Sequence, residues 1–120
     1  MLSFASFGAI YTDQENGVIY DFEDGKLTIS GTGTITGDSV DKAIGRNRNA
    51  LDYSVEEIII ENGITSIGAW TFYNCVNLTS VTIPSSVTSI GDSAFCNCGS
   101  LESVTIPSSV RTIGNKVLVI

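Results

Sequence analysis

Leu78–Gly91 reads LTSVTIPSSVTSIG, and Leu101–Gly114 reads LESVTIPSSVRTIG, 23 residues further along the chain. The two stretches differ at only three positions, and weaker copies extend the same spacing back to Val55. A fixed period of this length is the signature of a solenoid built from stacked coils. The apolar columns that recur at this interval are Ile58, Val81 and Val104; Ile60, Ile83 and Ile106; Ile67, Ile90 and Ile113; and Phe72, Phe95 and Leu118.

Each unit contains the signals of one coil. Val81–Ile83 alternates apolar and polar residues, which predicts a short strand with one face inward. Pro84 ends that strand because it lacks the N–H group that a neighbouring strand would use. Gly91 is expected to turn the chain with a positive φ. Asp92 is expected to cap a short helical or 3₁₀ turn that carries Ala94 and Phe95 inward.

A single coil cannot fold alone. It offers about seven apolar side chains, each contributing roughly 1.5–3 kcal/mol when buried. Ordering its backbone costs roughly 1–2 kcal/mol per residue, which is more than these side chains supply. The coils must therefore share one core, with parallel strands about 4.8 Å apart. This geometry predicts that Ile67, Ile90 and Ile113 lie in a single file.

Several of these stretches resemble a known repeat. Thr65–Gly68 (TSIG), Phe72–Leu78 (FYNCVNL) and Leu78–Gly91 are similar to the BspA-like leucine-rich repeat family, over about residues 55–114. Gly25–Gly33 (GKLTISGTG) resembles the stretch that often precedes these repeats. The resemblance implies a leucine-rich-repeat solenoid in a secreted or surface-attached bacterial protein. It also implies partners that are other proteins, on a host or on a cell surface, in adhesion.

The N-terminal part reads as a β-hairpin. Val18–Phe22 and Leu27–Ile29 are expected strands, and Asp24-Gly25 supplies a turn that needs positive φ. Thr34–Thr36 is expected to add a third short strand. Residues 38–51 carry apolar residues at near-helical spacing and predict a short, irregular helix.

Asp38 is the expected N-cap of that helix. The hairpin and helix together are expected to cover the first coil, as the ends of solenoids require. The overall expectation is a mainly β leucine-rich-repeat solenoid with short helical turns and an N-terminal cap. The division is residues 1–54 for the tail and cap and residues 55–120 for the solenoid, about two and a half to three coils.

Both ends of the sequence carry apolar segments. Met1–Ala9 ends in small residues but lacks the basic region of a signal peptide, so it fits equally a signal remnant and a non-native extension. Lys116–Ile120 stops within the third unit with no polar cap. This end favours a piece of a longer array or a short relative of one. The uncapped C-terminal coil predicts self-association with another chain at its edge.

Charge and composition exclude several classes of function. The 120 residues carry a formal charge of −7, which disfavours nucleic acid and anionic membrane surfaces as partners. No apolar run approaches the roughly 20 residues that span a bilayer, so membrane insertion is not expected. The sequence has no histidine, which removes the commonest general base and metal ligand. We therefore expect a protein that is not an enzyme and holds no cofactor or metal.

The three cysteines predict packing rather than chemistry. Cys75 and Cys98 occupy equivalent positions, so stacking would place their Cβ atoms about 4.8 Å apart, beyond the usual disulfide separation of about 3.5–4.5 Å. A ladder of reduced, buried thiols is preferred to a redox pair or a metal site. Cys96 is expected to be the most accessible of the three.

The charged side chains have a conservative and a functional interpretation. Glu56, Glu57 and Glu61 are expected together on the first strand of the repeats. The preferred interpretation of these glutamates is a solvated acidic edge. The remote alternative is a glycan hydrolase in which two of them act as paired catalytic carboxylates. Lys42, Arg46 and Arg48 are expected to decorate the predicted helix.

The outward strand face is the candidate contact surface. Its columns are Glu57, Ser80 and Ser103, and Ile59, Thr82 and Thr105. This face is hydroxyl-rich and mildly acidic and lacks an aromatic anchor of the kind that binding hot spots favour. The same serines and threonines are explained equally by their solubility and strand propensity. The leading hypothesis is a protein-binding or adhesion module, and the alternative is a structural spacer within a larger surface protein.

Overall fold

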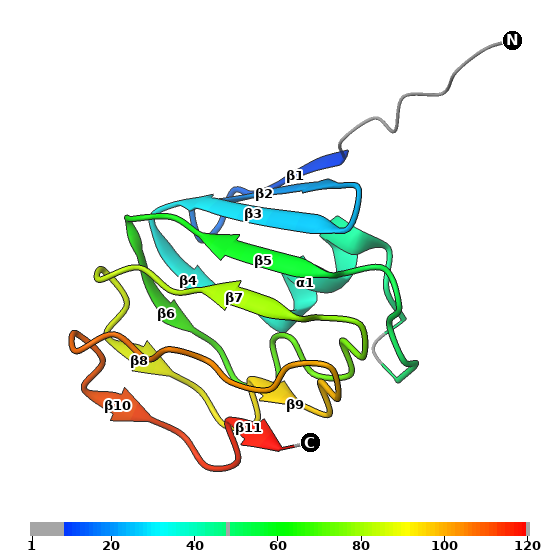
Figure 1. Cartoon of the computed structure of the whole chain (residues 1–120). Coiled ribbons are helices and arrows are strands. Elements are labelled where there is room, and N and C mark those ends of the chain that lie inside the picture. Colours follow the sequence, from blue (N-terminus) through cyan, green and yellow to red (C-terminus); the bar gives the residue numbers. More distant parts are fainter. Residues whose placement is uncertain (1–8, 48, 120) are drawn as a thin grey trace, which may run out of the picture.

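The computed structural model describes residues 9–47 and 49–119, and it is a solenoid of parallel strands with one helix (Figure 1). The elements before the repeats are β1 Ala9–Asp13, β2 Val18–Glu23, β3 Lys26–Gly31, β4 Gly33–Ile35 and α1 Gly37–Ile44. The later strands are β5 Glu57–Ile60, β6 Ile64–Ile67, β7 Ser80–Thr82, β8 Ser89–Ile90, β9 Phe95–Cys96, β10 Thr112–Ile113 and β11 Leu118–Val119.

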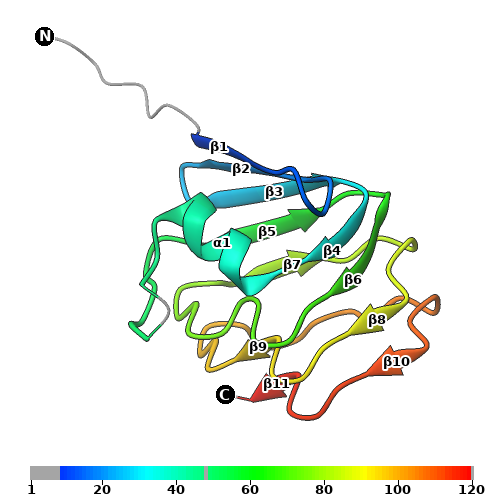
Figure 2. The same ribbon diagram turned by 180° about the vertical axis from the view of Figure 1, so that it is seen from behind.

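Each coil of the solenoid passes through three sides. The first side is a sheet in the order β1-β2-β3-β5-β7, in which β1, β2 and β3 are antiparallel and the later pairs are parallel. The second is the parallel sheet β10-β8-β6-β4, and the third carries the parallel pair β11-β9. Seen from behind, α1 lies on this third side, above β9 and β11 (Figure 2). The helix therefore forms the third side of the first coil, whereas later coils have extended backbone on that side.

The predicted single file of isoleucines is confirmed. Ile35 pairs in register with Ile67, Ile67 with Ile90, and Ile90 with Ile113. The first three are buried, whereas Ile113 at the end of the file is 54% exposed. Phe72 and Phe95 stack in the same way, with ring centroids 5.4 Å apart. The shared core is thus continuous from the hairpin to the last coil.

The predicted hairpin is present and is part of the solenoid. Asp24 and Gly25 both have positive φ, as the turn between β2 and β3 requires. Strand β3 then pairs in parallel with β5, so that Leu27 lies beside Ile58. The sequence did not predict β1, which adds an antiparallel strand outside β2. The sheet therefore runs without interruption from the N-terminal strands into the repeats.

The predicted helix was wrong at both ends. It covers only Gly37–Ile44, and its N-cap is Thr36, whose Oγ1 accepts a hydrogen bond from the Ser39 N–H at 3.2 Å. Asp38 lies instead in the first turn. Gly45 ends the helix in the left-handed conformation, with φ 70°. Gly45 is therefore the C-cap of the helix.

The predicted helical turn after Gly91 was also wrong. Residues 92–94 form a non-helical turn, and β9 follows directly. Asp92 therefore caps no helix, and its Oδ1 accepts a hydrogen bond from the Asn115 N–H of the next coil at 2.8 Å. Ala94 and Phe95 are fully buried, as predicted. The prediction of which residues face the core was therefore right, although the predicted local conformation was not.

Gly91 does not have the predicted positive φ. The left-handed residues of the repeat come two and six positions later, and the Cβ that a larger residue would carry at Gly91 would lie 2.7 Å from the Gly68 carbonyl carbon. The same close approach recurs at Gly114, against Gly91. Glycine is thus needed because successive coils touch at this position.

The strand that the repeat predicts at residues 104–106, next to β7, is not formed, whereas the short strand predicted at Thr34–Thr36 is present as β4. Residues 101–107 have no assigned strand, although Leu101 is buried and Val104 packs against the core. Strand β7 is therefore the edge of the described five-stranded sheet. The N-terminal prediction for Met1–Ala9 falls almost wholly on residues 1–8, outside the described residues.

Candidate functional site

The outward face of the first sheet carries two straight rows of side chains. Inward residues of its strands, such as Leu27 and Ile58, are fully buried, so the alternate residues point to solvent. Strand pairing aligns these outward residues across β2, β3, β5 and β7. One row is Glu23, Lys26, Glu57 and Ser80, and the other is Asp21, Thr28, Ile59 and Thr82. We call these eight residues the strand face.

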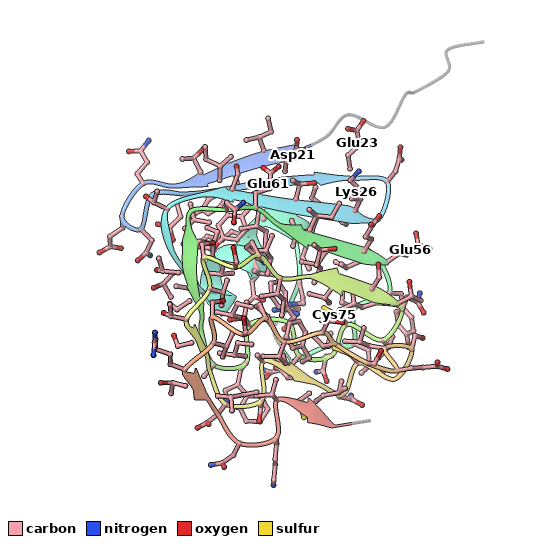
Figure 3. All side chains as sticks on the ribbon, turned by 60° about the vertical axis from the view of Figure 1, so that its left-hand side comes forward. Asp21, Glu23, Lys26, Glu56, Glu61 and Cys75 are labelled. Atoms are coloured by element: carbon pink, nitrogen blue, oxygen red, sulfur yellow. The ribbon has the colours of Figure 1, made fainter. Side chains whose placement is uncertain are left out.

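The strand face includes a shallow, acidic depression of about 490 Å³. Side chains of Asp21, Glu23 and Lys26 lie close together at the hairpin end of this sheet (Figure 3). The depression is lined by Asp21, Glu23, Asp24, Lys26, Thr28 and Glu57. Four carboxylates against one ammonium give it a negative potential, which attracts cationic groups.

The structure brings together only part of the face predicted from the repeat. Glu57, Ile59, Ser80 and Thr82 lie on the strand face in the predicted columns. Ser103 and Thr105 are exposed but lie in the stretch that forms no strand. The contact surface predicted for the third coil is therefore not an extension of the sheet.

Sequence reasoning missed the contribution of the hairpin to this face. Lys26 and Thr28 align with Glu57 and Ile59 across a separation of 31 residues, because α1 lengthens the first coil. A search at the 23-residue period cannot find that pair. The alternation within residues 26–31 was the available signal, since it marks Lys26 and Thr28 as outward residues of one strand.

Glu56 and Glu61 of the predicted acidic cluster lie apart. Glu56 precedes β5 and Glu61 follows it, and the two side chains lie at opposite ends of that strand (Figure 3). Five residues of extended chain span about 16 Å. The carboxylate pairs of glycoside hydrolases are about 5–9.5 Å apart, so Glu56 and Glu61 do not form such a pair.

The cysteines pack as predicted from their spacing. All three are free thiols, and Cys75 and Cys98 are fully buried, whereas Cys96 is half-buried and the most accessible. The Cys98 thiol donates a hydrogen bond to the Phe72 carbonyl oxygen at 3.1 Å. A hydrogen bond with Cys98, together with burial, raises the pKa of the Cys75 thiol. A thiol in this state is a poor nucleophile.

Arg46 does not decorate the helix, contrary to the prediction. Its guanidinium is buried and donates hydrogen bonds to the carbonyl oxygens of Thr71 and Tyr73, at 2.9 and 2.8 Å. One coil later, the equivalent carbonyls of Ala94 and Cys96 accept from the backbone N–H groups of Phe72 and Asn74.

The guanidinium therefore takes the place of two N–H groups that a preceding coil would supply. Asp41 neutralises the charge of Arg46 at 2.6 Å. The guanidinium also contacts the Cys75 sulfur, at 3.6 Å. Lys42, by contrast, forms an exposed ion pair with Asp38, and Arg48 lies outside the described residues.

A second hollow lies beside α1. Its volume is about 550 Å³, and it is lined by Gly37, Asp38, Asn49, Ala69, Trp70 and Tyr73. The Trp70 and Tyr73 rings meet edge to face, with centroids 5.4 Å apart, and Trp70 is 47% exposed. We call this hollow the aromatic pocket. Sequence reasoning missed it, although Trp70 departs from its repeat equivalents Ser93 and Lys116.

A metal-holding cluster and a membrane-spanning helix are both absent from the part of the chain that the structure describes. Residues 9–47 and 49–119 contain no group of three or more Cys, Asp or Glu side chains placed to hold a metal ion. Within the same residues, α1 is far too short and too polar to cross a bilayer, and no other helix does so.

Comparison with known proteins supports the repeat and the fold. Residues 42–119 match the model of the BspA type leucine rich repeat region, which comprises six copies of the repeat. A leucine-rich repeat protein from Eubacterium ventriosum has a similar structure, with a TM-score of 0.67 and 36% identity. The match covers 84% of this chain and 27% of that one.

A second solved structure, the leucine rich repeat protein TpLRR of T. pallidum, shares the fold alone. Its TM-score is 0.53 and its identity 15%, over 98% of this chain and 54% of that one. The chain thus spans less than two thirds of either relative. A search of the curated proteins found no match.

Proposed function

Because the chain belongs to the BspA-type leucine-rich-repeat family, we propose that it is a protein-binding module that acts through the strand face. The observation that carries the proposal is the pair of aligned rows across four strands, which present side chains without serving the core. The hydrogen-bonded sheet holds the backbone of these residues in place before a partner arrives, so little conformational freedom is lost on binding.

The charge of the face defines the partner. Asp21, Glu23, Asp24 and Glu57 surround Lys26, so a partner with exposed lysine or arginine side chains is favoured. Ile59 and Thr82 add a less polar strip beside this acidic area. We propose that the partner is a host or cell-surface protein and that the module works in adhesion, outside the bacterial cell. The family and the acidic face support this proposal.

Binding to immobilised extracellular-matrix and host-surface proteins tests it. The double variant Glu57→Lys/Thr82→Lys reverses the charge and blocks the second row. We expect it to weaken saturable binding at least about tenfold, because like charges then meet across the interface. The matched control is Glu15→Lys/Thr65→Lys, which makes the same change of net charge at two exposed residues outside the strand face.

Two outcomes would contradict the proposal. Equal loss of binding in the Glu15→Lys/Thr65→Lys control would mean that the net charge matters and the strand face does not. No saturable binding to any protein of the panel would favour the alternative role, a structural spacer in a larger surface protein.

We also propose that the last coil pairs with another chain. Ile106 and Ile113 are large apolar side chains that are 37% and 54% exposed. Exposed apolar surface next to a sheet edge promotes association. Sedimentation of the wild type and of Ile113→Lys tests this, and an unchanged mass distribution would argue against it.

A further inference from the structure

Trp70 occupies a position that the repeat does not require to be aromatic. Trp70, Ser93 and Lys116 are equivalent residues of successive coils, and all three have positive φ, at 58°, 54° and 53°. The turn thus dictates the backbone conformation, and serine or lysine satisfies it elsewhere. A bulky side chain is unfavourable in this conformation and is retained where something else requires it. Trp70 is nevertheless 47% exposed, so the core is not what requires it.

The aromatic pocket is held in shape before any ligand arrives. Tyr73 meets Trp70 edge to face, and the Arg46 guanidinium lies 5.7 Å from the centre of the Tyr73 ring. The same guanidinium binds the carbonyl groups of Thr71 and Tyr73, on either side of the buried Phe72. The hollow, of about 550 Å³, is wide and open to solvent, so it would receive one face of a ligand rather than enclose it.

The rest of the lining is polar but locally neutral. Asp38 and Asn49 contribute a carboxylate and an amide, which together can accept and donate hydrogen bonds. Asp38 pairs with Lys42 at 3.1 Å, and Asp41 pairs with Arg46. Because these charges are balanced, the pocket offers little excess attraction to a cation or an anion. A neutral ligand with many hydroxyl groups fits this chemistry best.

We propose that the aromatic pocket binds a neutral saccharide. One face of a sugar ring presents C–H groups, which carry slight positive charge and pack well on the negative face of an indole. The hydroxyl groups around the ring would then bond to the Asp38 carboxylate and the Asn49 amide. The site lies beside α1, because Gly37 and Asp38 are part of its lining, and it shares no residue with the strand face.

Fluorescence provides a direct test, since Trp70 is the only tryptophan in the sequence. Cellobiose, lactose, maltose and N,N′-diacetylchitobiose are the probes, titrated one at a time into the full chain. At least one of these sugars should shift the Trp70 emission to the blue in a saturable way and should protect the indole from quenching by iodide. Asn49→Ala and Asp38→Ala keep the reporter and should each raise the Kd at least about threefold.

Ligand-observed NMR tests Trp70 itself. Trp70→Ser introduces the residue that the next coil carries at this position and should abolish saturation transfer to the same sugar. Tyr53→Ser is the matched control, because Tyr53 is 63% exposed but does not line the pocket. The control should bind as the wild type does.

Three outcomes would overturn the proposal. The first is no saturable change with any of the four sugars, by fluorescence and by NMR. The second is binding that survives in the Asn49→Ala and Asp38→Ala variants and in a folded Trp70→Ser variant. The third is saturable binding of tetramethylammonium in place of the sugars, which would assign the pocket to a cationic group.

Discussion

Gly91 illustrates how a neighbouring coil constrains a single residue. The turn geometry of the repeat is carried by left-handed residues such as Ser93 and Asn97, which need not be glycine. Gly91 is needed because backbone atoms of Gly68 and Ala69 occupy the space of a side chain. A glycine can therefore be required by the close approach of two chain segments and not by a backbone angle.

Gly91→Ala is expected to reduce the free energy of unfolding by about 1–3 kcal/mol, because the added methyl group forces two backbones apart. Urea unfolding followed by circular dichroism measures the change. Gly99→Ala is the matched control, since a Cβ there meets nothing within 4 Å. Equal loss in both variants would contradict the packing explanation.

Tyr20 makes the stability of the fold depend on alkaline pH. Its ring is fully buried, and burial is the main cause that raises its pKa from 10.0 to about 12. Below pH 10, both the folded and the unfolded chain keep this proton. Between pH 10 and 12, the unfolded chain loses it first, so stability falls as the pH rises.

Tyr20→Phe should remove this part of the pH dependence, which is roughly 1–3 kcal/mol between pH 9 and pH 12. The variant also loses hydrogen bonds at neutral pH, since the hydroxyl accepts one from the Thr36 N–H at 3.4 Å and also has Ser39 as a partner, so the alkaline slope and not the absolute stability is the readout. Urea unfolding at several pH values provides the measurement, with Tyr53→Phe as the control at an exposed ring. An unchanged alkaline slope in Tyr20→Phe would refute the assignment.

At the scale of elements, α1 and Arg46 together replace one side of the first coil. The helix supplies the apolar residues Val40 and Ala43 to the core. It cannot supply the outward N–H groups with which a strand would meet the next coil, because its own hydrogen bonds use them. Arg46 supplies two such donors, and Asp52 then resumes the ladder by pairing with Cys75.

Arg46→Met should be the most damaging substitution of a charged residue in the cap. It leaves two buried carbonyls without donors and Asp41 without its buried partner, a loss of about 3–5 kcal/mol. Chemical denaturation measures it. Lys42→Met breaks an exposed ion pair on the same helix and should have little effect. If both variants unfold at the same denaturant concentration, Arg46 has no capping role.

At the scale of the whole molecule, the two ends of the stack differ. The antiparallel strands β1 and β2 continue the first sheet beyond the first coil. The last coil instead leaves Ile106 and Ile113 exposed. We propose that residues 1–54 act as the cap of the solenoid of residues 55–120. The buried contacts of Arg46 with Thr71 and Tyr73 across this boundary support that division of roles.

Position in the stack should decide what an isoleucine contributes to stability. Ile90→Ala removes a fully enclosed side chain from the middle of the file and should cost about 2–5 kcal/mol. Ile113→Ala makes the same chemical change in the same file but at its exposed end, and should cost much less. Thermal unfolding compares the two. Equal losses would mean that burial along the stack does not govern stability.

The resemblance of its motifs to known repeats indicated the family, and the sequence by itself determined the period, the inward columns and the hairpin. These depend on local alternation and on repetition, both of which are visible along a single chain. Only the tertiary structure decided where Lys26 aligns, why Gly91 is glycine, what Arg46 binds and how Trp70 comes to border a pocket. Each of these depends on which segments meet across the stack, and α1 shifts that register by an amount that the repeat spacing does not contain.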